Sequence, residues 1–146
     1  MLSDIEQAIL QLNNLGTIIQ NALRDEVTQE AKECIAQAAQ DIVYNAYTPL
    51  FLSRRKENGG LMDERNITAD ATVDTLTVHN YTPLQNLYGG DDNSNLADIV
   101  EEGNTAYYMG RPGPRPFMQG ADDMLSDGRA EKALCVGLQR QGIDIN

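Results

Sequence analysis

The apolar residues of this chain repeat with two different periods, and this change of period constrains the fold more than any other feature. Residues 2–23 read LSDIEQAILQLNNLGTIIQNAL, and their apolar residues recur in steps of three and four, as on one face of a helix. Residues 67–73, ITADATV, instead alternate between apolar and polar residues, as in a strand. Helical patterns at both ends of the chain, around a short segment of strand, predict an α+β fold with a small antiparallel β-sheet.

The N-terminal helical part is expected over residues 3–47. Ser3 and Glu6 have the spacing of a capping box, so a helix is expected to begin there. Gly16 costs about 1 kcal/mol relative to alanine inside a helix, which permits a kink or break near residues 13–16. A second helical pattern covers residues 26–47, and Pro49 is expected to end it, because the residue before a proline avoids helical geometry. One face of this second helix carries Val27, Ala31, Cys34, Ala38 and Ile42.

The strand pattern changes parity after Val73, because the next apolar residues are Leu76 and Val78. A two-residue turn at positions 74 and 75 would place Val73 opposite Leu76, and Ala71 opposite Val78. A β-bulge would account for the same change of parity, and it remains the alternative. Both interpretations predict sheet.

The remaining segments complete a single domain over residues 1–146, with sheet and loops over about 50–110. Residues 88–95, YGGDDNSN, are expected to form an exposed loop because glycine, asparagine and aspartate favour turns. Residues 96–103, LADIVEEG, predict about two turns of helix closed by Gly103. The C-terminal helical part is expected over about 116–141, with an interruption at Gly128.

The charge of the chain is unevenly distributed. The formal net charge is -11, and residues 67–110 contain seven acidic residues and no lysine or arginine. An acidic surface of this kind favours contact with basic protein surfaces and disfavours binding to phosphates. Alternatively, it would face DNA that must slide past the protein without binding to it. The chain also lacks a basic leader and a long apolar run, so neither a secretion signal nor a membrane span is expected.

The polar residues do not form a recognisable catalytic or metal-binding pattern, so we expect no enzyme, no cofactor and no metal. Asp91, Asn93, Asn95 and Glu102 occupy positions 1, 3, 5 and 12 of a calcium loop, but position 6 requires glycine and holds leucine. The single histidine, His79, has no acid or nucleophile placed with it in the sequence. The two cysteines, Cys34 and Cys135, lack metal-binding spacing and are expected to be free thiols.

Two arginine-bearing stretches flank the acidic segment. The first, LSRRKENGGL, contains Arg54 and Arg55, and the second, GRPGPRPF, contains Arg111 and Arg115. Prolines 112, 114 and 116 fix φ near -65°, and we expect Phe117 to anchor the second stretch in the core, which leaves its arginines displayed.

These arginines suggest a way for copies of the chain to associate. Arginine forms forked pairs with carboxylates, so copies could join head to tail, with the arginine loops of one against the acidic segment of the next. Such a contact closes into a ring when the rotation permits. Pairing of the arginines within their own subunit is the alternative.

Five stretches of the chain resemble, in the same order, the tail-completion or head–tail joining (neck) proteins of long-tailed bacteriophages. The resemblance covers about residues 42–145. The stretches are AYTPLFLSRRKENGGLMDERNI (46–67), LTVHNYTP (76–83), IVEEG (99–103), GRPGPRPFMQGADDML (110–125) and GLQRQGID (137–144). The residues at 88–95 and the insertion NTAYYM at 104–109 depart from the family's pattern.

The resemblance implies a non-enzymatic virion protein, assembled in the host cytoplasm, that forms a ring at the head–tail junction. The ring would be a hexamer or, alternatively, a dodecamer, would contact the adjacent neck and tail-tube proteins, and would pass DNA through its lumen without specific binding. A tail terminator proper is one alternative. An acidic DNA-mimic-type binding module is another. The motifs and the charge pattern together give the candidate assembly interface: Arg54, Arg55, Gly59, Gly60, Glu102, Arg111, Arg115 and Phe117.

Overall fold

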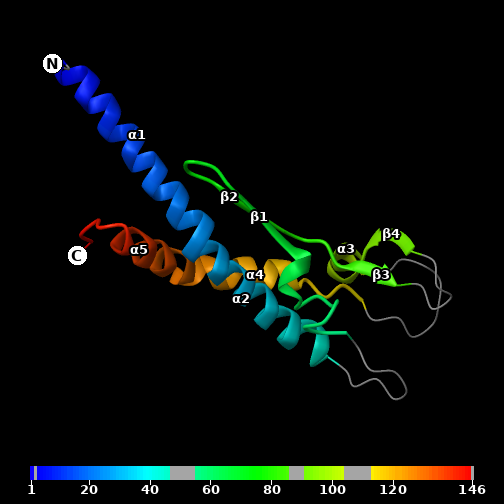
Figure 1. Ribbon diagram of the computed structural model, residues 1–146. Coiled ribbons are helices and arrows are strands. Elements are labelled where there is room, and N and C mark those ends of the chain that lie inside the picture. The colour runs from blue at the N-terminus through cyan, green and yellow to red at the C-terminus, as the bar shows by residue number, and fades with distance from the viewer. Residues whose placement is uncertain (2, 47–54, 86–90, 104–112, 146) are drawn as a thin grey trace.

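One long helix, two short antiparallel strand pairs and a C-terminal helical pair form the α+β fold of this protein (Figure 1). The computed structural model describes residues 1, 3–46, 55–85, 91–103 and 113–145. The long helix consists of α1 (Asp4–Ala22), the π-helical turn η1 (Leu23–Val27), α2 (Thr28–Ala38) and the π-helical turn η2 (Ala39–Tyr44). The predicted fold class is confirmed.

The N-terminal helical part is one continuous helix, so the two helical patterns join and the kink or break that the sequence permitted near residues 13–16 does not occur. Its start is as predicted, because the Ser3 hydroxyl accepts from the Glu6 backbone N–H at 3.2 Å and the Glu6 carboxylate accepts from the Ser3 N–H at 2.7 Å. Gly16 does not interrupt α1. A Cβ at this position would lie 3.0 Å from Cγ1 of Val73, so the glycine makes room for the neighbouring hairpin.

The α2 face predicted from the sequence packs against the C-terminal helices. Ala31, Cys34 and Ala38 are buried on it, and burial raises the pKa of the Cys34 thiol. A Cβ at Gly120 of the crossing helix would lie 3.6 Å from the Ala38 Cβ, which shows how closely the small residues let the two helices approach. The helix ends at Tyr44, and the predicted stop at Pro49 lies outside the described residues.

The strand pattern forms a β-hairpin, but its register differs from the predicted one by two residues. Strands β1 (Ile67–Ala71) and β2 (Leu76–Asn80) pair Ala71 with Leu76. The connection is a four-residue loop, because the Thr72 backbone N–H donates to the Thr75 carbonyl at 2.8 Å and the Thr72 hydroxyl accepts from the Thr75 N–H at 3.2 Å. Neither a two-residue turn nor a bulge is needed, and the shift by two residues leaves each side chain on its predicted face.

The second strand pair corrects the expected loop at 88–95. Its described part, Asp91–Asn95, is strand β4, which pairs with β3 (Pro83–Gln85). Helix α3 (Leu96–Glu102) follows directly, and the Asn95 side chain caps it by accepting from the Ala97 N–H at 3.1 Å. Gly103 ends α3 with a φ of 79°, as the sequence predicted.

The C-terminal part is a kinked helical pair. Pro116 lies at the N-cap of α4 (Phe117–Met124), and the chain turns within η4 (Leu125–Arg129) before α5 (Ala130–Arg140). Gly128 adopts a φ of 95° at this kink, so the predicted interruption is confirmed. Both cysteines are free thiols, also as predicted.

The core lies where α2 and η2 cross α4 and meet the hairpin and α3. A short 3-10 turn, η3 (Glu64–Asn66), leads from this core into β1. Within the described parts of the chain, no helix is both long and apolar enough to cross a membrane. The buried cluster comprises Cys34, Ile35, Ala38, Ala39, Val43, Tyr44, Leu61, Ile67, Ala97, Val100, Phe117 and Ala121.

Candidate assembly surface

The glycine pair of the first arginine stretch forms a tight turn, in which Gly59 has a positive φ and Gly60 has no room for a side chain. Gly59 adopts a φ of 74°, and its N–H donates to the Asp63 carboxylate at 2.6 Å. A Cβ at Gly60 would lie 2.3 Å from the Arg55 carbonyl oxygen. The Arg65 guanidinium donates to Oδ2 of Asp63 at 2.6 Å, the oxygen that Gly59 also contacts, and to Oδ1 at 2.9 Å. The hydrogen bonds from Arg65 and Gly59 hold the pKa of the Asp63 carboxyl well below its usual range.

A buried polar network fixes this turn to the rest of the molecule. The Tyr44 hydroxyl donates to the Arg55 carbonyl at 2.6 Å and accepts from the Leu61 N–H at 3.1 Å. The Asn80 side chain donates to the Leu61 carbonyl at 2.8 Å, and the Thr82 hydroxyl donates to the Asn80 side-chain oxygen at 2.6 Å. Because these groups are buried and bonded to one another, the turn that carries Arg55 is held in one conformation.

The third and fourth stretches of the resemblance, IVEEG and GRPGPRPFMQGADDML, contact each other. The Arg115 N–H donates to the Val100 carbonyl at 2.9 Å, and a Cβ at Gly103 would lie 2.8 Å from the Pro114 nitrogen. Pro116 offers no side-chain cap to α4. The Glu101 carboxylate takes that role, since it accepts from the backbone N–H groups of Met118 at 2.9 Å and Gln119 at 3.1 Å.

The interface predicted from the sequence therefore omitted Glu101 and included its neighbour Glu102. The Glu102 side chain is exposed on α3. A signal was present in the sequence, because a helix that begins after a proline lacks a local cap and needs an acceptor from elsewhere. Nothing in the sequence alone identifies which acid supplies it.

The other predicted interface residues differ in how far their side chains are exposed at the surface. Arg54 and Arg111 lie outside the described residues. Arg55 is half-buried, and its guanidinium donates to the Pro83 carbonyl at 3.0 Å. The Arg115 side chain is also half-buried, so it is less displayed than expected. Phe117 is fully buried in the core as the predicted anchor, and any part it plays in an interface is indirect.

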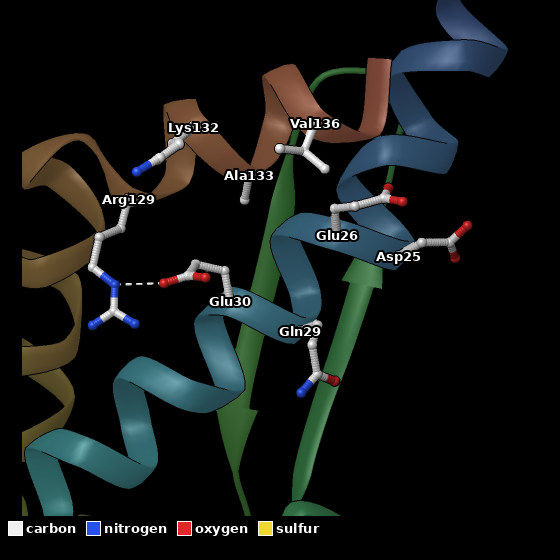
Figure 2. Close-up of a pocket in the computed structure, with 8 residues that line it drawn as sticks. All are labelled: Asp25, Glu26, Gln29, Glu30, Arg129, Lys132, Ala133 and Val136. Carbon is white, nitrogen blue, oxygen red and sulfur yellow. Dashed lines mark hydrogen bonds and ion pairs between the residues drawn. The ribbon is translucent and has the colours of Figure 1, made fainter. Parts of the chain in front are cut away.

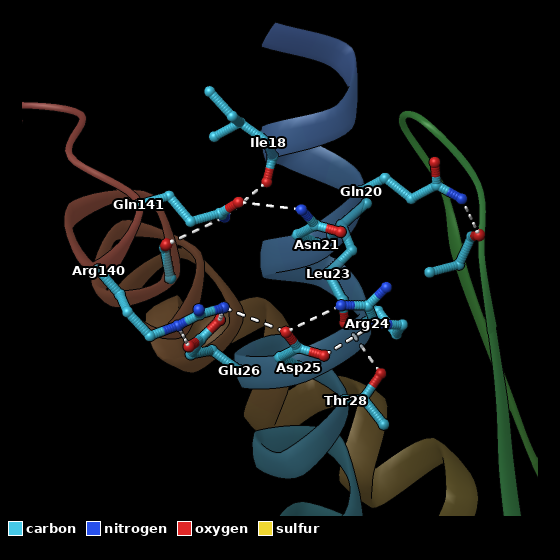
Figure 3. A network of polar contacts seen from close by, with 12 residues as sticks. Ile18, Gln20, Asn21, Leu23, Arg24, Asp25, Glu26, Thr28, Arg140 and Gln141 are labelled. Carbon is cyan, nitrogen blue, oxygen red and sulfur yellow. Dashed lines mark hydrogen bonds and ion pairs between the residues drawn. The ribbon is translucent and has the colours of Figure 1, made fainter. Parts of the chain in front are cut away.

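Two arginines outside the two arginine stretches, Arg129 and Arg140, also form ion pairs within the subunit. A cleft of about 680 Å³ lies between the long helix and α5. Figure 2 shows Glu30 paired with Arg129 across it. Arg129 also donates to the Gln37 side chain at 3.0 Å. At the far end of α5, Arg140 pairs with Glu26 (Figure 3). These pairs fasten α5 to the long helix.

Among the residues that the structure describes, exposed apolar side chains gather on the N-terminal half of α1. Every residue of the segment 4–15 is exposed, and this half projects beyond the other elements (Figure 1). The exposed fractions are 73% for Ile5, 51% for Ile9 and 68% for Leu12, all on the stripe that the sequence pattern identified. Apolar side chains gathered on one exposed helical face in this way are typical of surfaces that contact another protein, a membrane or a ligand. This surface is absent from the candidate interface predicted from the sequence.

The comparisons with known proteins give the family. The family model described as YomN matches residues 2–140. The SPbeta prophage-derived uncharacterized protein YomN of Bacillus subtilis (strain 168) is 32% identical over 106 residues, which covers 69% of this chain and 68% of that protein. No solved structure matches the chain significantly. The resemblance to bacteriophage proteins is confirmed as to phage origin, although the matched family is not described as a tail-completion or neck family. The chain belongs to the YomN family and is a phage-derived protein.

Proposed function

We propose that this chain is a non-enzymatic structural protein of the phage particle, which forms a homo-oligomeric ring at the head–tail junction and joins the tail to the head. The observation that carries the proposal is the bare apolar face of the projecting half of α1 on a phage-derived chain. A monomer that acts alone gains nothing from such a face, whereas a subunit of an assembly buries it.

The fixed arginine turn supports the same function. Arg55 sits on a turn held by hydrogen bonds from Tyr44 to its carbonyl and from its guanidinium to Pro83, so a contact made through it loses little conformational entropy. The acidic segment offers carboxylates for such a contact on a neighbouring copy, for example the exposed side chains of Asp70, Asp98 and Glu102. A head-to-tail contact of this kind closes into a ring or extends into a filament.

An acidic DNA-mimic-type module is the second candidate, and the lack of basic residues between positions 67 and 110 favours it. One of the acids of this segment, Glu101, is already used to cap α4. A DNA mimic also has no use for the apolar face of α1. These two points make the structural role the stronger proposal.

The test is made on phage particles. Particles of a phage that encodes this chain are purified, and the chain is located in them with an antibody and gold-labelled electron microscopy. Gold at the head–tail junction supports the proposal. A chain that is abundant in the lysate but absent from purified particles, or gold at another part of the particle, overturns it.

Deletion of the gene distinguishes a head–tail joining protein from a tail terminator. Loss of a joining protein leaves filled heads beside tails of normal length. Loss of a tail terminator gives tails of irregular length, and that outcome would transfer the chain to the alternative role.

A further inference from the structure

The projecting half of α1 is largely apolar on a strongly acidic chain, and its charged side chains are Asp4 and Glu6 at its start. Residues 7–23 contain no charged side chain, although the chain as a whole carries a net charge of -11. At 1.5 Å per residue, the exposed segment 4–15 is roughly 18 Å long. Ile5, Ile9 and Leu12 line one face of it. An occupant of this face must therefore be apolar, and it needs no charges of its own.

A lipid surface does not fit this segment. Helices that bind membrane surfaces carry lysine and arginine on their polar face to meet anionic lipid. The first basic side chain of this chain is Arg24, beyond the exposed segment, and the nearest charges are those of Asp4 and Glu6. The occupant is therefore a protein surface.

An apolar groove of matching chemistry lies on the same chain, between α2, β2 and α4. Its volume is about 360 Å³, and polar groups enter it only through the exposed residues Asp122 and Ser126. Protein interiors are normally close-packed, so an open groove of this kind lacks the side chains that would fill it. The main apolar side chains that line it are Ile35, Leu76, Val78, Met118, Ala121 and Leu125.

The α1 segment of one chain cannot reach the groove of that same chain. The groove lies beside α2, and α1 continues into α2 as one helix with helical backbone angles at each junction. Ile9 lies 22 positions before Ala31 of the groove, which is roughly 33 Å along this helix. The C-terminal half of α1 is fixed to the rest of the subunit by hydrogen bonds. Gln141 donates to the Ile18 carbonyl at 2.8 Å, and Gln20 donates to the Ala71 carbonyl at 2.9 Å (Figure 3).

We propose that the projecting half of α1 docks into the groove between α2, β2 and α4 of a second copy of this chain. Each copy then donates one helix and receives another. The contact is heterologous, so copies add head to tail and close into a ring when the rotation per subunit permits. This docking proposal rests on the proposed function in one respect: both require copies of the chain to associate with one another.

The first test changes the charge of the docking face. Leu12→Glu places a carboxylate on the stripe, and we expect the mass from light scattering to fall to that of a monomer at concentrations where the wild type is multimeric. Asn14→Glu is the matched control, because residue 14 lies about 200° around the helix from residue 12 and is also exposed. A monomeric wild type, or a Leu12→Glu variant with wild-type mass, overturns the proposal.

The second test identifies what the helix touches. Ile9→Cys and Leu125→Cys variants are made in a Cys135→Ser background, and the two purified proteins are mixed and oxidised. We expect a disulfide that joins one chain of each kind. Disulfides confined to pairs of Ile9→Cys chains would show that α1 pairs with α1, which overturns the docking site.

The two proposals fail in different experiments. If the wild type is multimeric and neither α1 substitution nor cross-linking supports the groove, this docking contact is wrong and the proposed function stands. If the cross-link forms but the chain is absent from purified particles, the proposed function is wrong and the contact stands.

Discussion

Gly60 lies in a turn that admits no side chain. A Cβ there would meet the Arg55 carbonyl oxygen at 2.3 Å and the Lys56 carbonyl oxygen at 2.6 Å, and both are backbone atoms that cannot rotate away. We expect Gly60→Ala to lower the free energy of unfolding by about 1–3 kcal/mol, measured by urea denaturation. Gly113→Ala is the control, because no atom lies within 4 Å of a Cβ at that position. Equal effects of the two substitutions would contradict this account.

Glu101 and Glu102 are adjacent in the chain but have different structural roles. The Glu101 carboxylate accepts two backbone N–H groups at the start of α4, and Glu102 is exposed. We expect Glu101→Ala to cost about 1 kcal/mol of stability, as for loss of a helix cap, and Glu102→Ala to cost much less. Thermal unfolding of both variants measures the difference. A larger loss for Glu102→Ala would reverse the assignment.

Asp63 makes the stability depend on pH. The Arg65 guanidinium and the Gly59 N–H lower the folded-state pKa of Asp63 below the ordinary value of about 3.9. Its stabilisation is therefore complete above the unfolded-state pKa and is lost as the pH falls toward the lower folded-state pKa. We expect Asp63→Asn to be less stable than the wild type at neutral pH, and the difference to shrink below about pH 4. Urea midpoints across this range measure it, with Asp70→Asn as an exposed control.

Residue-scale features were predictable from the sequence where their partners are close in the chain. Ser3 and Glu6 form their capping box three positions apart, and Gly128 breaks a helix by its own backbone conformation. The cap supplied by Glu101 to Met118 spans 17 positions, so it depends on the tertiary fold. Because this contact depends on the tertiary fold, the sequence could not show which of the two adjacent acids makes it, and Glu102 was assigned to the predicted interface in place of Glu101.

At the scale of elements, packing corrected what local patterns suggested. Gly16 has a poor helix propensity, yet α1 continues through it because the hairpin packs against the glycine. The hairpin register was missed by two residues because Thr72 and Thr75 close a wider loop than the alternation of apolar residues implies. The segment 91–95 reads as a loop by composition, and pairing with Pro83–Gln85 makes it a strand.

The projecting half of α1 is expected to be separable from the fold. Every residue of the segment 4–15 is exposed, so among the residues that the structure describes, deletion of residues 1–14 removes no buried side chain. We expect the free energy of unfolding to change by no more than about 0.5 kcal/mol, while self-association is lost. Circular dichroism during urea denaturation measures the first effect, and light scattering measures the second. A large loss of stability would mean that this half of the helix packs on its own subunit.

At the scale of the whole molecule, composition pointed to assembly through charge, and the structure adds an exposed apolar face as a second candidate contact. The acidic total of -11 means that copies repel one another at low salt. An association driven by apolar burial alone is therefore expected to strengthen as salt screens this repulsion, whereas arginine–carboxylate contacts between copies weaken. The salt dependence of association thus separates the two contributions.

The variant Arg55→Glu tests the charged contribution. Salt would still screen repulsion between its copies, but the attraction made by the arginine turn would be gone. We therefore expect its association constant to rise with sodium chloride more steeply than that of the wild type, as measured by light scattering over a range of concentrations. Arg24→Glu is the matched control, since it makes the same change in net charge at an exposed residue that pairs with its neighbour Asp25. If both variants show the same salt dependence, the arginine turn takes no part in the contact, and the docking of α1 alone would have to hold the assembly together.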